Sequence, residues 1–416
     1  MATVTGLSGG TTYSLPVGSN DQNGTAQALA NAISAALANR SLVQEGLTAP
    51  AGTSSFTILS APNQTYAMSA GQNAVAIGTG GPVTVFGSGS LGEQILGDNS
   101  NITLALRGGS GSVVLGDGND FVSNALATTG FSITTGTGND TVLATGVGNN
   151  TIRTGAGTTL VGLGRGQNTV SLNGNDTIYG NAVGGGSETV FGGNGPSVLF
   201  PGSSNLYFVG GAGSASVYGG SGSETIFAGT GGGLFGAGAA GNNTLVNAQG
   251  GSATLYGAAT GDLLFATGKG TTLMVAGAGN ETLDGSTSSA NNTFYGSTNG
   301  ADIINGGSGA DTIYAGVSST VRGGAGADLI VFQASRISGT IQVLGFQPGV
   351  EMGSFQGFVG SALTSGVVGV GVGTTAGQSV GQTVQIGGVN STQISLGNGT
   401  VIQFVGVTGL TGSNFT

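Results

Sequence analysis

The segments GGSGADTIY (residues 306–314) and GGAGADLIV (residues 323–331) are two copies of one nine-residue unit. Each copy begins with a glycine-rich bend that leads to an aspartate. The last three residues of the copy have a large aliphatic residue, Ile313 or Ile330, at their centre. A third copy, GGSGSETIF (residues 219–227), has glutamate at the aspartate position. Strand alternation directs the central aliphatic side chain inward and its two neighbours outward. Each unit therefore predicts one turn followed by one short β-strand.

Degenerate copies of the unit extend through most of the chain, at an average spacing of about 9.5 residues between Asp120 and Asp328. Two units make a coil of about 19 residues, and each coil can bury its few aliphatic side chains only against its neighbours. The sequence therefore predicts an all-β fold, a parallel β-roll or β-solenoid of about 13 coils over residues 79–336. Glycine suits the bends because they need positive φ angles and close approach between coils.

The flanking regions differ from the repeats. Residues 1–78 predict a small N-terminal α/β cap with one helix at about residues 25–44, which places Leu29, Ile33 and Leu37 on one stripe. The alternative role for this helix is docking to a neighbouring subunit. Residues 337–416 predict a C-terminal β region with glycine–valine alternation.

Composition excludes several classes of protein. The 416 residues include 89 glycines but only 7 prolines, without the strict three-residue period of collagen. A hydrophobic fraction of 38% argues against disorder. The chain has no histidine and no cysteine, which excludes Ser-His-Asp triads, HExxH zinc sites, thiol nucleophiles and disulfides. The segment GLSGG (residues 6–10) fits the G-x-S-x-G formula by chance in so glycine-rich a chain.

Charge and hydropathy limit the partners. A net charge of −10, with one lysine and six scattered arginines, provides no basic surface for a phosphate backbone, so no nucleic-acid partner is expected. No apolar stretch is long enough for a transmembrane segment. Residues 1–20 lack the layout of a cleavable signal peptide, so the general secretory route is not expected.

The repeat G-G-x-G-x-D-x-U-x, in which U is a large aliphatic residue, resembles that of the RTX, or haemolysin-type, calcium-binding family. The resemblance implies a parallel β-roll that binds Ca²⁺ through turn carbonyls and aspartates of successive coils on one edge. Alternate units fall on the same edge, which makes neighbours of Asp311 and Asp328, of Asp120 and Asp140, and of consecutive acids from Asp262 to Asp302. The candidate Ca²⁺ ligands are Gly306, Gly309, Asp311, Gly323, Gly326, Asp328, Asp120, Asp140, Asp262, Glu281 and Asp302. For Asp262, Glu281 and Asp302 the alternative is that they are solvated acids that cap turns.

The resemblance also implies export through the type I secretion machinery and folding outside the cell when calcium arrives. Residues 345–349 and the closing residues 399–416 are similar to the uncleaved secretion segment of such proteins, and an ordinary β-rich cap is the alternative. The implied location is therefore secreted, extracellular or at the cell surface.

Aromatic residues follow the inward aliphatic position in many units, where a freely soluble roll would carry polar residues. Contiguous outward rings would form association surfaces, unless strand curvature turns them into the core. They are Tyr179, Phe191, Phe200, Phe208, Tyr218, Phe227, Phe235, Tyr256, Phe265, Tyr295 and Tyr314.

The sequence therefore favours a secreted bacterial structural protein, not an enzyme, that assembles with copies of itself. A surface-layer, matrix, fibre or biofilm subunit would fit, because the repeat leaves no separate catalytic domain. Two alternatives remain: a calcium-binding adhesin or other binding module, and a solenoid polysaccharide lyase or epimerase. The latter needs clustered cations and a base, but the cations are scattered along the sequence.

Overall fold

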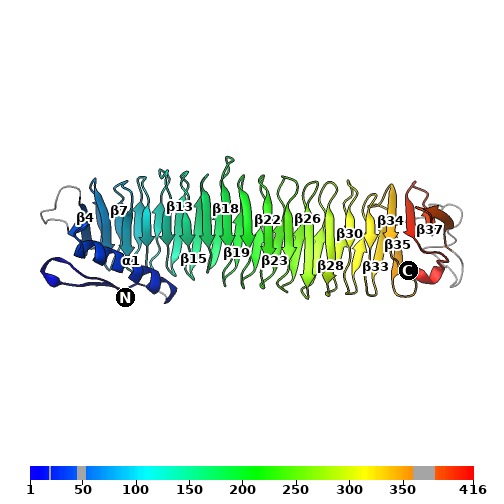
Figure 1. Cartoon of the computed structure of the whole chain (residues 1–416), viewed down its shortest axis with the longest axis horizontal. Coiled ribbons are helices and arrows are strands. Elements are labelled where there is room, and N and C mark those ends of the chain that lie inside the picture. Colours follow the sequence, from blue (N-terminus) through cyan, green and yellow to red (C-terminus); the bar gives the residue numbers. More distant parts are fainter. Residues whose placement is uncertain (18–19, 45–52, 359–379) are drawn as a thin grey trace. The chain divides into compact units, whose positions relative to one another are not determined.

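The computed structural model describes residues 1–17, 20–44, 53–358 and 380–416. It is nearly all β and forms a parallel β-solenoid, as the repeat predicts (Figure 1). The glycine–valine alternation predicted near the C-terminus falls within residues 359–379, outside the described residues. Contacts between residues divide the chain into two units, Met1–Ser214 and Ala215–Thr416, each with its own part of the solenoid.

In the first unit, consecutive strands alternate between two parallel sheets, named here by the parity of their strand numbers. The even-numbered sheet contains β4 (Ser54–Leu59), β6 (Gln72–Ile77), β8 (Glu93–Gly97), β10 (Gly111–Val114), β12 (Phe131–Thr134), β14 (Thr151–Arg153), β16 (Gln167–Ser171), β18 (Ser187–Phe191) and β20 (Asn205–Val209), and β3 (Leu42–Gln44) pairs with β4. The odd-numbered sheet contains β5 (Gln64–Ala67), β7 (Val83–Phe86), β9 (Ile102–Ala105), β11 (Phe121–Ser123), β13 (Asn139–Ala144), β15 (Thr158–Leu163), β17 (Asn175–Tyr179) and β19 (Ser197–Phe200).

The second unit repeats this arrangement. Its even-numbered sheet contains β22 (Glu224–Ala228), β24 (Thr244–Asn247), β26 (Leu263–Gly268), β28 (Thr282–Ser288), β30 (Ile303–Asn305), β32 (Thr320–Arg322) and β34 (Thr340–Leu344). Its odd-numbered sheet contains β21 (Ala215–Val217), β23 (Gly233–Gly236), β25 (Ala253–Tyr256), β27 (Thr272–Val275), β29 (Thr293–Tyr295), β31 (Thr312–Tyr314), β33 (Leu329–Gln333) and β35 (Met352–Gln356).

The odd-numbered sheet has 16 strands over the described residues, one for each turn of the solenoid. The solenoid therefore has about 16 turns, slightly more than the predicted number of about 13. Parallel pairing begins at β3, before residue 79, and continues past residue 336 to β35. The core lies between the two sheets, where most strands bury at least one inward residue. In the first unit this core row includes Val142 and Ile178 from the odd-numbered sheet and Ile152 and Val190 from the even-numbered sheet.

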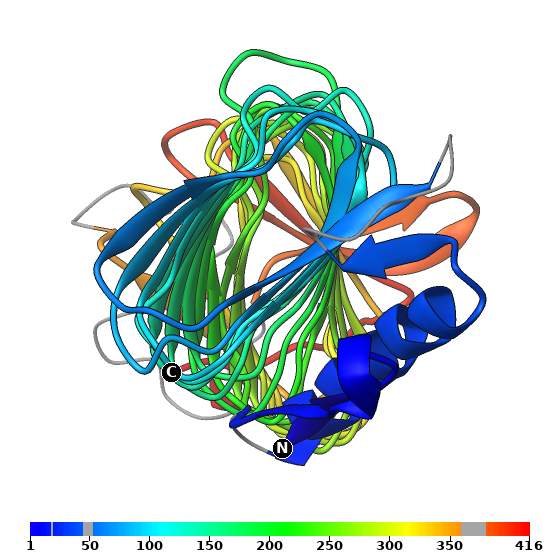
Figure 2. The same cartoon turned by 90° about the vertical axis from the view of Figure 1, so that its left-hand side faces the viewer.

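Helix α1 (Asn20–Ala38) begins and ends several residues before the predicted limits. Its residues Ala30, Ile33 and Leu37 are buried together with outward side chains of β4, β6, β8 and β10, among them Phe56 and Leu96. The hairpin of β1 (Ala2–Val4) and β2 (Tyr13–Leu15), joined through the 3-10 helix η1 (Ser8–Gly10), completes this N-terminal cap. Figure 2 shows α1 on the outer face of the first coils. The cap therefore covers apolar side chains that would otherwise be exposed there.

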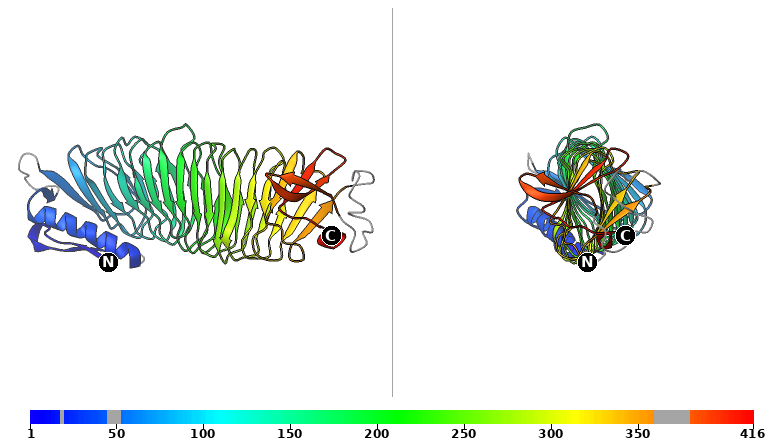
Figure 3. Two further views of the ribbon diagram at one scale, coloured as in Figure 1. Left: turned by 45° about the vertical axis from the view of Figure 1, so that its right-hand side comes forward. Right: turned by 90° about the vertical axis from the view of Figure 1, so that its right-hand side faces the viewer.

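The C-terminal residues fold onto the second unit. Strand β38 (Val401–Val405) pairs in parallel with β34 and antiparallel with β37 (Val389–Ser395), which forms a hairpin with β36 (Gln382–Ile386) (Figure 3). After the 3-10 helix η3 (Gly412–Asn414), the Phe415 ring lies 5.8 Å from that of Phe404 between centroids. Residues 399–416 therefore contain β38 and η3, joined by residues outside regular secondary structure, and their role in export stays a prediction.

Nine of the eleven predicted outward rings are exposed or half-buried, but Phe208 and Phe235 are fully buried, so their prediction was wrong. Both belong to units that lack an acidic residue before the strand. In β20 the buried residues are Leu206 and Phe208, and Tyr207 is the exposed ring. A one-residue change of register moves every side chain of a strand to the opposite face.

Gly326 offers a test of how tightly the turns stack. It has a φ of +136°, and a Cβ there would lie 2.2 Å from the carbonyl oxygen of Gly309 in the preceding coil. Gly345 has a φ of +72° and no neighbour within 4 Å of a Cβ. We expect Gly345→Ala to lower the free energy of unfolding by about 1–2 kcal/mol through backbone strain alone, and Gly326→Ala to lower it by more. Urea unfolding followed by circular dichroism measures both, and equal losses would show that the turn has room for a methyl group.

Candidate functional site: the buried carboxylate ladders

The carboxylate position of the repeat lies immediately before each strand or at its first residues, and strand pairing aligns these positions into one row per sheet. On the odd-numbered sheet of the second unit, the row runs through Asn292, Asp311 and Asp328. On the even-numbered sheet of that unit it runs through Asp262, Glu281 and Asp302. In the first unit Asp120 and Asp140 are neighbours. The structure therefore brings together the acidic residues that the repeat spacing predicts to be adjacent.

Asp311 is buried and accepts hydrogen bonds from the backbone on both of its oxygens. Its Oδ1 accepts the N–H of Asn292 in the preceding coil at 2.6 Å, and its Oδ2 accepts the N–H of Gly307 in its own turn at 2.6 Å. The Oδ1 of Asp328 accepts the N–H of Asp311 at 2.8 Å. Each carboxylate therefore links its own coil to the coil before it.

Asp120 and Asp140 form the same link in the first unit. The Oδ1 of Asp140 accepts the N–H of Asp120 at 3.0 Å, and the Oδ1 of Asp120 accepts the N–H of Ile102 at 2.8 Å. The second oxygen of each carboxylate is buried without a hydrogen-bond donor among the described residues.

Asp262, Glu281 and Asp302 cap turns, as one interpretation of the sequence holds, but they are buried rather than solvated. The Oδ2 of Asp262 accepts the N–H groups of Ala258 and Ala259 at 2.9 and 3.0 Å. The Oδ1 of Asp302 accepts the N–H of Glu281 at 3.0 Å. The turn and the preceding coil satisfy both oxygens of Asp262 and of Asp302, whereas Glu281 Oε1 is buried without a hydrogen-bond partner among the described residues.

The four predicted glycines give the turns and carboxylates room. A Cβ at Gly306 would lie 1.9 Å from the carbonyl oxygen of Gly323, and one at Gly309 would lie 2.2 Å from that of Ala290. A Cβ at Gly323 would lie 2.0 Å from Glu351 Oε1 and 2.6 Å from Asp328 Oδ2. These glycines, with Gly326, are therefore required by close packing of backbone and carboxylates.

Glu351, which follows Asp328 in the row, was not among the predicted site residues. It is fully buried, and its Oε2 accepts the N–H of Gln347 at 2.6 Å. No N–H group of the described residues donates to Glu351 Oε1 or Asp328 Oδ2. Both oxygens lie over Gly323, and the two carboxyl groups interact with each other. The glycine bend at residues 345–349, with an acid two residues later, was a sequence indication of this position.

Burial is the main cause of unusual pKa values in these rows. It raises the pKa of Asp120 to about 8, and the Asp140 carboxylate adds to the rise. Burial likewise raises the pKa of Glu281 to about 8 and that of Glu188 to about 7. The pKa of Glu351 rises to about 7, through burial and then the neighbouring Asp328. These carboxyl groups therefore retain protons at pH values where exposed acids are ionised.

At Asp311 the hydrogen bonds leave no free carboxylate oxygen for the calcium ion that the RTX resemblance implies. Ca²⁺ needs six to eight oxygen ligands, but the oxygens of Asp311 accept amide N–H groups. The turn carbonyls are engaged as well: Gly307 O accepts the N–H of Ala325 at 2.8 Å and Ser288 O accepts that of Ser308 at 2.9 Å. Among the described residues, no group of three or more acidic side chains is placed to hold a metal ion. Calcium binding therefore remains a prediction from the sequence.

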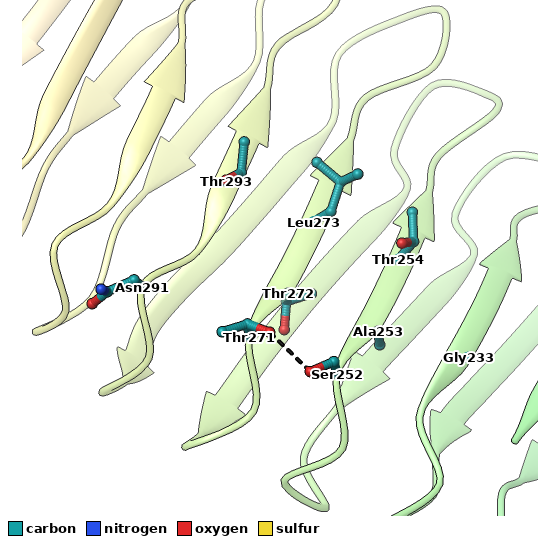
Figure 4. A pocket seen from close by; sticks show the side chains of 9 residues that line it. All are labelled: Gly233, Ser252, Ala253, Thr254, Thr271, Thr272, Leu273, Asn291 and Thr293. Atoms are coloured by element: carbon teal, nitrogen blue, oxygen red, sulfur yellow. Dashed lines mark hydrogen bonds between the residues drawn. The ribbon is translucent and has the colours of Figure 1, made fainter.

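A shallow, uncharged groove of about 310 Å³ lies along the odd-numbered sheet of the second unit (Figure 4). Ser252, Thr271 and Asn291 from consecutive coils line its edge, and its floor is lined by Thr254, Leu273 and Thr293. The hydroxyl groups of Ser252 and Thr271 are 2.9 Å apart and hydrogen-bond to each other. The groove therefore presents polar groups at the spacing of the coils.

Comparisons of the chain with family models, curated proteins and solved structures found no match. No helix within the described ranges has the length and apolar character needed to cross a membrane. The RTX resemblance therefore rests on the repeat motif itself.

Proposed function

We propose that the protein is a structural subunit that assembles with copies of itself through the outer faces of its solenoid. The observation that carries this proposal is the set of exposed apolar side chains on both sheets. In the first unit Tyr179 is 49% exposed on the odd-numbered sheet, and Phe191 and Tyr207 are 42% and 44% exposed on the even-numbered sheet. In the second unit Tyr218 and Tyr256 are 47% and 39% exposed.

Stacking between coils orders some of these rings. The Tyr179 and Phe200 rings lie 5.2 Å apart at 10°, and those of Tyr295 and Tyr314 lie 4.3 Å apart at 4°. Ordered rings lose little conformational entropy on association, which favours binding of a second copy. The low fraction of charged residues, 6%, also leaves little repulsion between such surfaces.

An enzymatic role has weaker support. Several arginines are engaged within their own unit: the Arg336 guanidinium lies 5.3 Å from the centre of the Tyr295 ring, and the Arg107 guanidinium lies 5.0 Å from that of Phe86. We therefore propose a non-catalytic protein. Its location outside the cell is part of the proposal and is supported only by the resemblance of the repeat.

A binding module is the second candidate, favoured by the hydroxyl- and amide-lined groove in Figure 4. Its chemistry suits a neutral polar ligand such as a polysaccharide chain. The hydrogen bond between Ser252 and Thr271 satisfies part of this polarity internally, so the groove supports binding less strongly than the exposed rings support assembly.

The assembly proposal predicts that removing exposed rings raises the concentration needed to assemble. Tyr207→Thr combined with Phe191→Thr should raise the threshold by about tenfold, because less apolar area is buried on association. Light scattering and electron microscopy over a concentration series measure this. Thr169→Ser, in the same outward row as Tyr207, is the matched control. Dispersed monomers of the unaltered protein at high concentration would contradict the proposal.

A further inference from the structure

We infer that the carboxylate position of the repeat forms a hydrogen-bond ladder that joins successive coils without a metal ion, and that the Oδ1 of either aspartate or asparagine can make the bond between coils. This inference concerns how the fold is held together and does not depend on whether the chain assembles. It departs from the calcium-dependent closure that the repeat motif implies.

Asparagine and aspartate make the same bond between coils within one row. Asn292 Oδ1 accepts the N–H of Thr272 at 3.0 Å, and Asp311 Oδ1 accepts the N–H of Asn292 at 2.6 Å. On the even-numbered sheet, Asn243 Oδ1 accepts the N–H of Glu224 at 2.8 Å, and Asp262 Oδ1 accepts the N–H of Asn243 at 2.9 Å. The bond requires a side-chain carbonyl oxygen at this distance and no negative charge.

The second polar atom of each side chain matches the turn of its own coil, because an amide donates there where a carboxylate accepts. The Nδ2 of Asn292 donates to the Ser288 hydroxyl and to the carbonyl of Ala290, both at 3.0 Å. The Oδ2 of Asp311 instead accepts from Gly307. Turns in the two cases present opposite polar groups to the side chain, and each forms a closed hydrogen-bond set without an ion.

Exposed asparagines form a second ladder, in which each side chain accepts a hydrogen bond from the following coil rather than the preceding one. The Oδ1 of Asn101 accepts the N–H of Asn119 in the following coil at 2.9 Å, and Asn119 Oδ1 accepts that of Asn139 at 2.8 Å. In the second unit Asn291 Oδ1 accepts the N–H of Ala310 at 2.9 Å. The buried ladder accepts from the preceding coil and the exposed one from the following coil, so each such turn is bonded on both sides.

The test uses the full chain and compares two substitutions at one position. Asp311→Asn retains the oxygen that accepts the Asn292 N–H, whereas Asp311→Ala removes both acceptor oxygens and leaves two buried N–H groups unsatisfied. We expect Asp311→Asn to keep the circular dichroism spectrum but to melt below the parent protein, because its Nδ2 faces the N–H of Gly307. Asp311→Ala also loses the bond to Asn292 and should melt at a clearly lower temperature still. Both results should be the same in calcium and in a chelator.

Two outcomes would overturn the inference. One is loss of the β spectrum of the parent protein in chelator with recovery in calcium. The other is an Asp311→Asn variant that melts as low as Asp311→Ala while Asn292→Asp, the reverse change in the same row, raises the melting temperature in calcium. If Asp311→Ala does not fold, the comparison of parent and Asp311→Asn in chelator still decides the question.

Discussion

The stabilisation that the buried carboxyl groups provide is expected to fall as the pH rises from about 4 to about 8, where the raised pKa values of Asp120 and Glu281 lie. The ordinary values are 3.8 for aspartate and 4.5 for glutamate, so these groups bind their protons more tightly in the folded chain than in the unfolded chain. The stabilisation is fully present below the ordinary values. It is lost as the pH rises through the raised values, because deprotonation then leaves an ionised carboxylate buried.

The expected loss is large because several groups contribute. One unit of pKa difference corresponds to about 1.4 kcal/mol, and Glu188 and Glu351 add to the same trend with pKa values of about 7. Thermal unfolding at constant ionic strength, followed by circular dichroism, should show a melting temperature that falls over this range. Glu281→Gln should flatten the dependence and Asn243→Asp, which adds a buried acid, should steepen it. A melting temperature that rises with pH would show that the rows are ionised and compensated in the folded protein.

Phe294→Ala is expected to lower the free energy of unfolding of the second unit by about 3–5 kcal/mol. Phe294 is fully buried between the sheets. It fits because residue 285, on the other sheet, is glycine: a Cβ there would lie 2.8 Å from the ring's Cζ. Truncating the ring removes its dispersion contacts and leaves a cavity that the stacked backbone cannot fill by relaxing.

The adjacent Tyr295 is the matched control, because it lies one residue away and faces outward. Its ring stacks on Tyr314 at 4.3 Å, so Tyr295→Ala should cost only about 1 kcal/mol. A double variant, Phe294→Leu with Gly285→Ala, should recover part of the loss expected for Gly285→Ala alone, because the shorter side chain leaves room for the new methyl group. Urea unfolding gives each value, and equal losses for Phe294→Ala and Tyr295→Ala would contradict the assigned core.

The sequence predicts the architecture because the repeat encodes both the bend and the inward residue. The complete motifs containing Asp311 and Asp328 pair in the predicted register. In units without an acid, the residue that aligns with the acids of neighbouring coils is harder to identify from the sequence. Thr159, rather than its neighbour Thr158, aligns with Asp140 and Asp176. Two adjacent threonines give no local signal to choose between them, and pairing with the neighbouring coils decides the register.

The sequence predicts which acidic residues are neighbours, but it does not predict that their carboxylates are buried. A motif shows that Asp302 follows a glycine turn, and the same motif would occur if its carboxylate bound Ca²⁺, bonded the turn or faced water. The choice depends on which atoms surround the oxygens, and here they are amide N–H groups of the turn and of the preceding coil. The atoms around each carboxylate are therefore set by the stacking of coils, which brings together residues about 20 positions apart in the sequence.

Amide hydrogen exchange at Asn292 and Asp311 tests the metal-free ladder most directly, because these N–H groups donate to the Oδ1 atoms of Asp311 and Asp328. The exchange rates are measured in chelator and again with calcium in excess. The ladder predicts strong and equal protection of both amides in the two conditions. Exchange at the rate of an unfolded chain in chelator, with protection gained only when calcium is added, would contradict it.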